Sequence, residues 1–145
     1  MNLKVIKLFL RAAIALSFLS AVADRFGLWS ASVSVWGNWD NFLAYTKVIN
    51  PWIPDSIIPA LGAMATIAEI IFALALLVGF KTELVARLSG LLLLLFALSM
   101  TFATGIKGAF DYSVFSASAA AFALSLMKEK FLEVDNLIAK PDNVK

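Results

Sequence analysis

The feature that most constrains this chain is a series of long segments made almost entirely of apolar residues. In residues 57–80, Glu69 is the only charged side chain. About 20 consecutive, mostly apolar residues suffice for a helix to cross a bilayer. Hydrophobic residues make up 61% of the chain and charged residues 15%, whereas a soluble domain is about 45–50% apolar and about 25% charged. The sequence therefore predicts an integral membrane protein.

Four segments have the composition of membrane-spanning helices: residues 3–23, 57–80, 84–106 and 109–127. Lysine and arginine gather at both chain ends and in the connection between the second and third segments. By the positive-inside rule, both termini are cytoplasmic. We expect one all-α domain over residues 1–145, a polytopic four-helix bundle in a bacterial cytoplasmic (inner) membrane. Residues 24–56 would form an outer loop and residues 128–145 a cytoplasmic tail.

The first segment has a second interpretation, as a cleavable secretory signal. Lys4 and Lys7 precede an apolar stretch that ends in Ala21-Val22-Ala23, a small-residue pattern typical of cleavage sites. However, Arg11 lies inside what would be the apolar core of such a signal. We therefore favour a membrane-spanning helix.

The predicted outer loop contains all four tryptophans: Trp29, Trp36, Trp39 and Trp52. Because indole rings prefer the lipid headgroup level, we expect this loop to lie on the outer membrane surface. Asn38 is a typical N-cap, and Asn50-Pro51 should end a helix. The pattern thus predicts a short interfacial helix over residues 39–49. This helix either anchors the loop to the membrane or forms a lid over a cavity among the membrane helices.

Glu69 is the most informative residue, because an isolated carboxylate deep in a bilayer costs at least about 2.5–3.5 kcal/mol. Arg11 lies about 12 Å into the first helix and Glu69 about 16 Å into the second, counted from the same side. We expect the two to pair, with Arg87 either joining them or snorkelling to the interface. The pair either fixes helix contacts or forms a site for a ligand, a proton or a quinone.

A second group of polar residues lies at the predicted outer boundary. Ser17, Ser20 and Asp24 share one stripe of the first helix. Lys107 and Asp111 are expected at a similar level to Asp24 and Arg25. These four charged residues form either an outer ion-pair network or separately solvated side chains.

Several classes of chemistry are excluded because the chain has no cysteine and no histidine. Thiol catalysis, thiolate metal sites and the usual haem and zinc ligands are therefore missing. The small net charge of +2 argues against a nucleic-acid partner. No phosphate-binding glycine loop or dinucleotide fingerprint occurs. We predict no catalytic or metal-binding residue and no evident cofactor, and we expect that the chain alone is not an enzyme.

Three stretches of the sequence resemble the DoxX family of membrane proteins. They are Arg11-Ala-Ala-Ile-Ala-Leu-Ser-Phe-Leu-Ser20, Ala68-Glu69-Ile-Ile-Phe-Ala-Leu-Ala-Leu-Leu-Val-Gly79 and Leu88-Ser-Gly90. The resemblance covers roughly residues 6–127, and its best part is the glutamate followed by glycine before a basic hairpin. It implies a four-helix membrane bundle linked to quinol oxidation, thiosulfate–quinone chemistry or oxidant defence.

The redox chemistry of that family does not transfer directly to a chain without cysteine or histidine. A redox role would require a bound quinone or a partner protein. Two functions follow: a noncatalytic membrane subunit that stabilises a redox or oxidative-stress partner, or a quinone- or lipid-binding protein or carrier centred on Glu69 and Arg11. The expected partners are the lipid bilayer and a membrane or redox protein, and the chain is also compatible with homo-oligomers.

Overall fold

The computed structural model describes residues 2–138, so the last part of the predicted tail, residues 139–145, lies outside the described residues. All regular secondary structure within the described range is helical. The predicted all-α class is confirmed.

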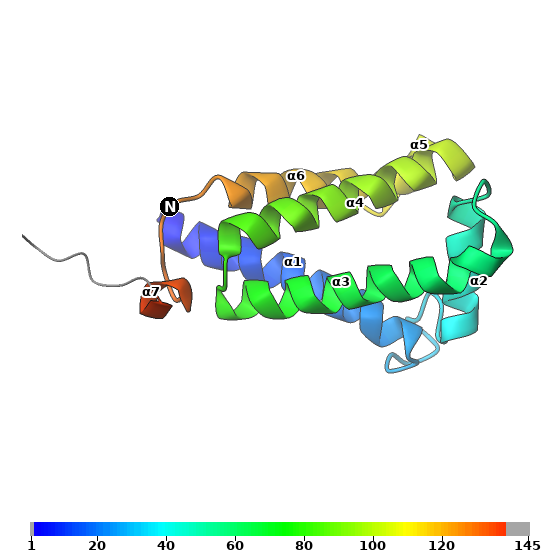
Figure 1. Cartoon of the computed structure of the whole chain (residues 1–145), viewed down its shortest axis with the longest axis horizontal. Coiled ribbons are helices and arrows are strands. Elements are labelled where there is room, and N and C mark those ends of the chain that lie inside the picture. Colours follow the sequence, from blue (N-terminus) through cyan, green and yellow to red (C-terminus); the bar gives the residue numbers. More distant parts are fainter. Residues whose placement is uncertain (1, 139–145) are drawn as a thin grey trace, which may run out of the picture.

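Three of the four predicted membrane segments form long apolar helices. They are α1 (Leu3–Arg25), α3 (Ile58–Val78) and α4 (Thr82–Thr104). The short 3-10 helix η1 (Asp55–Ile57) leads directly into α3. Each of the three is long and apolar enough to cross a membrane. Their axes run in roughly the same direction, with α3 antiparallel to both α1 and α4 (Figure 1).

The fourth segment differs from the predicted continuous helix over residues 109–127. It is divided into α5 (Ile106–Asp111) and α6 (Val114–Ser125). The break lies at Ser113, whose φ of 56° is left-handed and cannot continue an α-helix. The 12 residues of α6 span only about 18 Å, less than the hydrocarbon thickness of about 30 Å.

Small residues let these helices approach one another closely. Ala15, Ala73, Ala86 and Ala121 are fully buried in the core shared by α1, α3, α4 and α6. The hydroxyl of Ser118 on α6 donates to the carbonyl of Gly90 on α4 at 2.8 Å. Close packing of this kind replaces the hydrophobic driving force that lipid does not provide.

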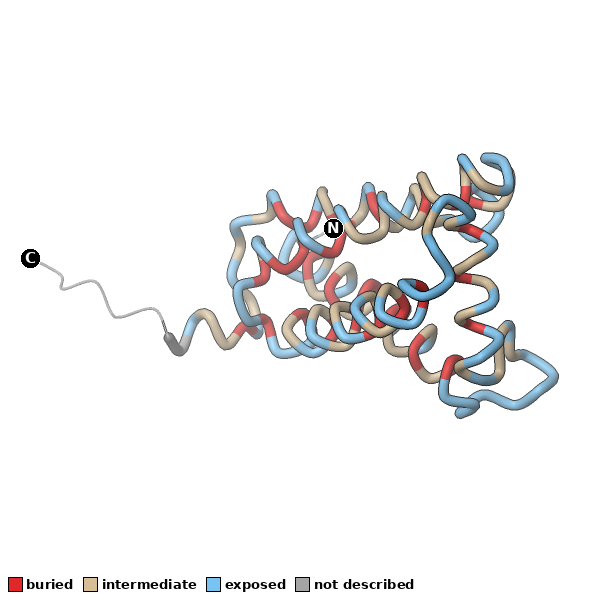
Figure 2. Tube along the Cα trace, turned by 45° about the vertical axis from the view of Figure 1, so that its right-hand side comes forward, coloured by how far each residue is buried: buried red, intermediate tan, exposed pale blue. Residues whose placement is uncertain are grey.

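The outward faces of the helices are apolar. Exposed residues recur along every long helix (Figure 2), and many of them are large hydrophobic side chains, such as Phe9, Met64, Ile71, Leu95 and Phe102. A face of this kind is stable against lipid tails, whereas in water it would be an extended hydrophobic patch.

The short helix predicted after the first membrane segment is confirmed. It is α2 (Trp39–Ile49), capped by the Asn38 side chain, which accepts from the backbone of Asn41. It packs on the start of α3 at Gly62, where an added Cβ would lie 2.7 Å from Leu43. A larger residue here would require the end of the Leu43 side chain to move.

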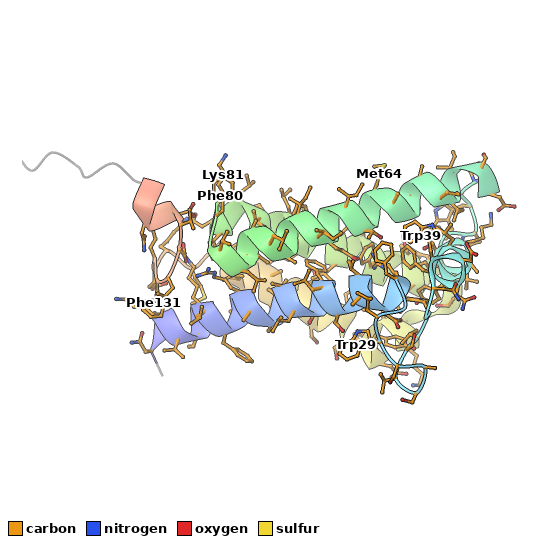
Figure 3. The ribbon with its side chains drawn as sticks, turned by 90° about the horizontal axis from the view of Figure 1, so that it is seen from below. Trp29, Trp39, Met64, Phe80, Lys81 and Phe131 are labelled. Atoms are coloured by element: carbon orange, nitrogen blue, oxygen red, sulfur yellow. The ribbon has the colours of Figure 1, made fainter. Side chains whose placement is uncertain are left out.

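After α6, the chain turns back across the opposite end of the helices. Residues 128–138, here called the strap, include the short helix α7 (Asp135–Ile138). The Asp135 carboxylate accepts from the backbone of Lys81 at 2.8 Å, at the start of α4. Figure 3 places Phe131 of the strap beside the first turns of α1, and Trp39 at the far end.

Candidate functional site

A deeply buried ion pair joins the end of α1 to the middle of α3. Arg25 Nη2 donates to Glu69 Oε1 at 2.9 Å, and Arg25 Nη1 lies 2.6 Å from Glu69 Oε2. Both side chains are about 98% removed from solvent, with 3% and 2% exposed. Arg25 also donates to the hydroxyl of Thr66 at 2.7 Å, and that hydroxyl donates in turn to the Gly62 carbonyl.

Aromatic rings enclose the arginine on its other sides. The guanidinium carbon lies 4.1 Å from the ring centre of Phe42 and 5.5 Å from that of Trp36. Trp36, Trp39, Phe42 and Tyr45, here called the aromatic cage, contact one another at ring-centre distances of 5.3–5.7 Å. Cation–π attraction strengthens when the cation is desolvated. The site therefore joins α1, α2 and α3.

The expected Arg11–Glu69 pair is wrong, and side-chain direction gives the physical reason. Helical side chains lean toward the N-terminus of their own helix. Arg11 therefore leans toward the start of α1, away from Glu69, whereas Arg25 leans back into the bundle. Because α3 is antiparallel to α1, Glu69 leans toward Arg25. The predicted pair was based on the depth of each residue along its helix, and depth does not distinguish the directions in which Arg11 and Arg25 lean.

Arg11 instead forms a second buried site at the opposite end of α1. Its guanidinium donates to the carbonyls of Leu76 and Leu77, among the last carbonyls of α3, at 2.8 and 3.0 Å. It also donates to the carbonyls of Phe131 and Leu132 in the strap. Such helix-terminal carbonyls lack partners within their own helix and attract cations.

The same end of the bundle buries a lysine and a glutamate. Lys7 Nζ lies 2.7 Å from Glu133 Oε1, and both side chains are at most 2% exposed. Arg11 Nη1 lies 3.8 Å from the same carboxylate oxygen. Sequence reasoning missed Glu133, because a carboxylate in a polar tail gives no signal of burial. The i, i+4 spacing of Lys7 and Arg11 on one face of α1 was the available clue.

The remaining predicted charges do not meet at either site. Arg87 is exposed on α4 and does not join Glu69. Lys107 and Asp111 pair with each other on the exposed surface of α5. The expected single outer network is therefore divided.

Asp24 fixes the loop that follows α1. Its carboxylate accepts from the hydroxyl of Ser34 and from the backbone of Val35 and Trp36, at 3.0 and 2.8 Å for the two amides. These bonds place Trp36 over Arg25. Two adjacent residues of α1 thus act on one site, Arg25 directly and Asp24 through the loop.

The four tryptophans fall into two pairs. Trp36 and Trp39 belong to the aromatic cage, whereas Trp29 and Trp52 are 48% and 57% exposed. Tyr45 at the edge of the cage is half-buried, and its burial, with the nearby Tyr112, raises the pKa of the Tyr45 phenol above its ordinary value. The sequence predicted the helix over residues 39–49, but not that its aromatic rings gather around Arg25.

A groove of about 610 Å³ runs along the last turns of α1, beside the loop. Ser17, Ser20 and Asp24 of the predicted polar stripe line it, together with Trp29 and Trp36. Its volume is within the range of about 300–1,000 Å³ that is typical of ligand pockets. No group of three or more carboxylates that could hold a metal ion occurs among the side chains that the structure describes, those of residues 2–136.

No protein-family model matches the chain, and neither a curated protein nor a solved structure matches it.

Proposed function

We propose that this chain is a DoxX-like membrane protein that acts as a noncatalytic subunit and stabilises a partner of a membrane redox or oxidative-stress system. The observation that carries the proposal is that the buried charged side chains of both ionic sites find their partners within the chain. Arg25 and Glu69 neutralise each other, and Glu133 lies against Lys7 and Arg11. Ionic groups used in this way lock helices together and hold the outward apolar faces in a fixed arrangement.

We further propose four membrane crossings with both termini in the cytoplasm of a bacterium. The three long apolar helices support three of the crossings. The fourth would use α6 with its flanking residues, packed along α4 and α1. The lysine-rich end formed by the start of α1, the start of α4 and the strap would lie on the cytoplasmic side. Trp29 and Trp52 would lie at the outer headgroup level.

The second candidate function is the binding of a quinone or another lipid-like molecule. The groove along α1 favours it, because Ser17 and Ser20 line a space of about 610 Å³ together with apolar side chains such as Val33. This placement replaces the predicted Glu69–Arg11 site, since those two side chains do not meet.

Purification from native membranes in a mild detergent, with mass spectrometry of proteins, lipids and quinones, tests both functions. The subunit proposal expects a stoichiometric membrane or redox protein that co-purifies with the chain. A matched preparation of the Ser17→Leu variant, which fills the groove, should retain that partner. A chain that purifies alone with a bound quinone, lost in Ser17→Leu, would contradict the subunit proposal and support the second function.

A further inference from the structure

The strap covers two buried cations at the end of the bundle where α1 begins. Lys7 and Arg11 are each 1% exposed, and the carboxylate of Glu133 lies against both. Lys7 also donates to the carbonyl of Glu129 at 2.7 Å. This cationic site therefore already accepts an anionic group, which the chain itself supplies.

Polar contacts tie the strap to the end of the bundle. Glu133 is the only residue of 128–136 that is buried. The backbone amides of Val134 and Asp135 donate to the carbonyls of Val78 and Gly79. Leu132 is 65% exposed and has a φ of 49°, a left-handed conformation that disfavours leucine.

The charge at this end is unbalanced. Its described residues, in 2–11, 79–87 and the strap, include seven cations and four carboxylates: Lys4, Lys7, Arg11, Lys81, Arg87, Lys128 and Lys130 against Glu83, Glu129, Glu133 and Asp135. An excess of positive charge at the end of membrane helices attracts anionic headgroups. Arginine and lysine both bind phosphate through charge-assisted hydrogen bonds. In Arg11, Nη1 is the nitrogen that donates to the strap and that its departure would free.

We propose that Lys7 and Arg11 form a binding site for a phosphate group, and that Glu133 occupies this site until phosphate displaces the strap. The phosphate belongs either to an anionic lipid headgroup or to free phosphate in solution. In a membrane, the first turns of α1 would lie near the headgroups, within reach of long basic side chains. Displacement exchanges one anion for another over the same two cations, so neither cation is left without a counter-charge.

The absence of native cysteine allows a direct distance measurement. Spin labels at Leu132→Cys on the strap and Leu95→Cys on α4 occupy side chains that are 65% and 62% exposed. In phosphatidylcholine vesicles, where choline neutralises the phosphate, we expect one short distance. In vesicles that contain phosphatidylglycerol, a second, longer population should appear.

Two further comparisons identify the source of the phosphate and show whether a phosphate group, and not negative charge alone, releases the strap. If the longer population appears with inorganic phosphate in phosphatidylcholine vesicles but not with phosphatidylglycerol, free phosphate is the ligand. If neither condition produces it, the proposal is overturned. The proposal also fails if phosphatidylcholine vesicles that contain oleate, a carboxylate, release the strap as well as phosphatidylglycerol does, because surface charge alone would then suffice.

Two matched variants test the role of the glutamate. Glu133→Gln should produce the longer population even in phosphatidylcholine. Glu129→Gln removes the same charge from the same strap, but its side chain makes no ion pair among the described residues, so it should leave the distance unchanged. Equal effects of the two variants on the distance would contradict the proposed role of Glu133. The lipid comparison uses the native glutamate, so it decides the proposal even if Glu133→Gln does not fold.

Discussion

We predict a strong energetic coupling between Arg25 at the end of α1 and Glu69 in the middle of α3. Glu69→Gln would remove the counter-charge of the buried guanidinium and leave it with neutral partners only: the new amide oxygen, the Thr66 hydroxyl and the aromatic cage. An unpaired charge in the apolar region costs about 2.5–3.5 kcal/mol. Because Arg25 ends α1, part of this cost is avoided if the side chain reaches the interface. We therefore expect Glu69→Gln to lower the free energy of unfolding by about 2 kcal/mol.

Arg25→Gln should have a similar effect, because it leaves Glu69 about 16 Å from the start of α3, too deep to reach the interface. The double variant Arg25→Gln/Glu69→Gln removes both charges and keeps two side chains that can hydrogen-bond. We expect it to cost about 2 kcal/mol in total, and not the 4 kcal/mol or so of additive effects. The coupling energy would then be about 2 kcal/mol.

Unfolding by a denaturing detergent in mixed micelles measures these free energies, and the fluorescence of Trp36 and Trp39 reports on the cage. The matched control is the Arg11→Gln/Glu69→Gln cycle, which should be additive within about 0.5 kcal/mol because the two side chains do not meet. A coupling below about 0.5 kcal/mol for Arg25 and Glu69 would refute the reasoning. So would a larger coupling for Arg11 and Glu69.

Two further variants test the docking of α2 and of the loop. Gly62→Ala should force the Leu43 and Phe42 side chains to move and cost about 1–3 kcal/mol, because the new methyl group would lie 2.7 and 3.1 Å from their ends. A change in the near-ultraviolet dichroism of the cage, which includes Phe42, would report this movement. An unchanged spectrum would contradict the close contact. Asp24→Asn should weaken three charge-assisted hydrogen bonds and increase proteolysis within residues 27–37. Wild-type resistance of this variant would show that the loop is held by other contacts.

Helix positions and their buried faces could be predicted from the sequence, because each depends on a local pattern. The three long helices follow from apolar segments of sufficient length, and α2 follows from its cap at Asn38 and its stop at Asn50. Gly62, Thr66, Glu69 and Ala73 are spaced three or four residues apart and so share one face of a helix, and all four are buried in α3. The broken fourth segment was missed, because the left-handed conformation of Ser113 leaves no clear mark in a run of small residues.

Pairing between helices was harder to predict, because it depends on contacts between residues distant in the sequence. Glu133 is 126 positions from Lys7, and only the path of the strap after α6 brings them together. The correct partner of Glu69, in contrast, was within reach of a simple rule. Arg11 and Arg25 lie on the same helix, and each leans toward its N-terminus. In an antiparallel pair, a glutamate in the middle of the second helix meets the arginine near the end of the first. Side-chain direction, added to depth, therefore selects Arg25, and leaves Arg11 for the carbonyls at the end of α3 and for the strap.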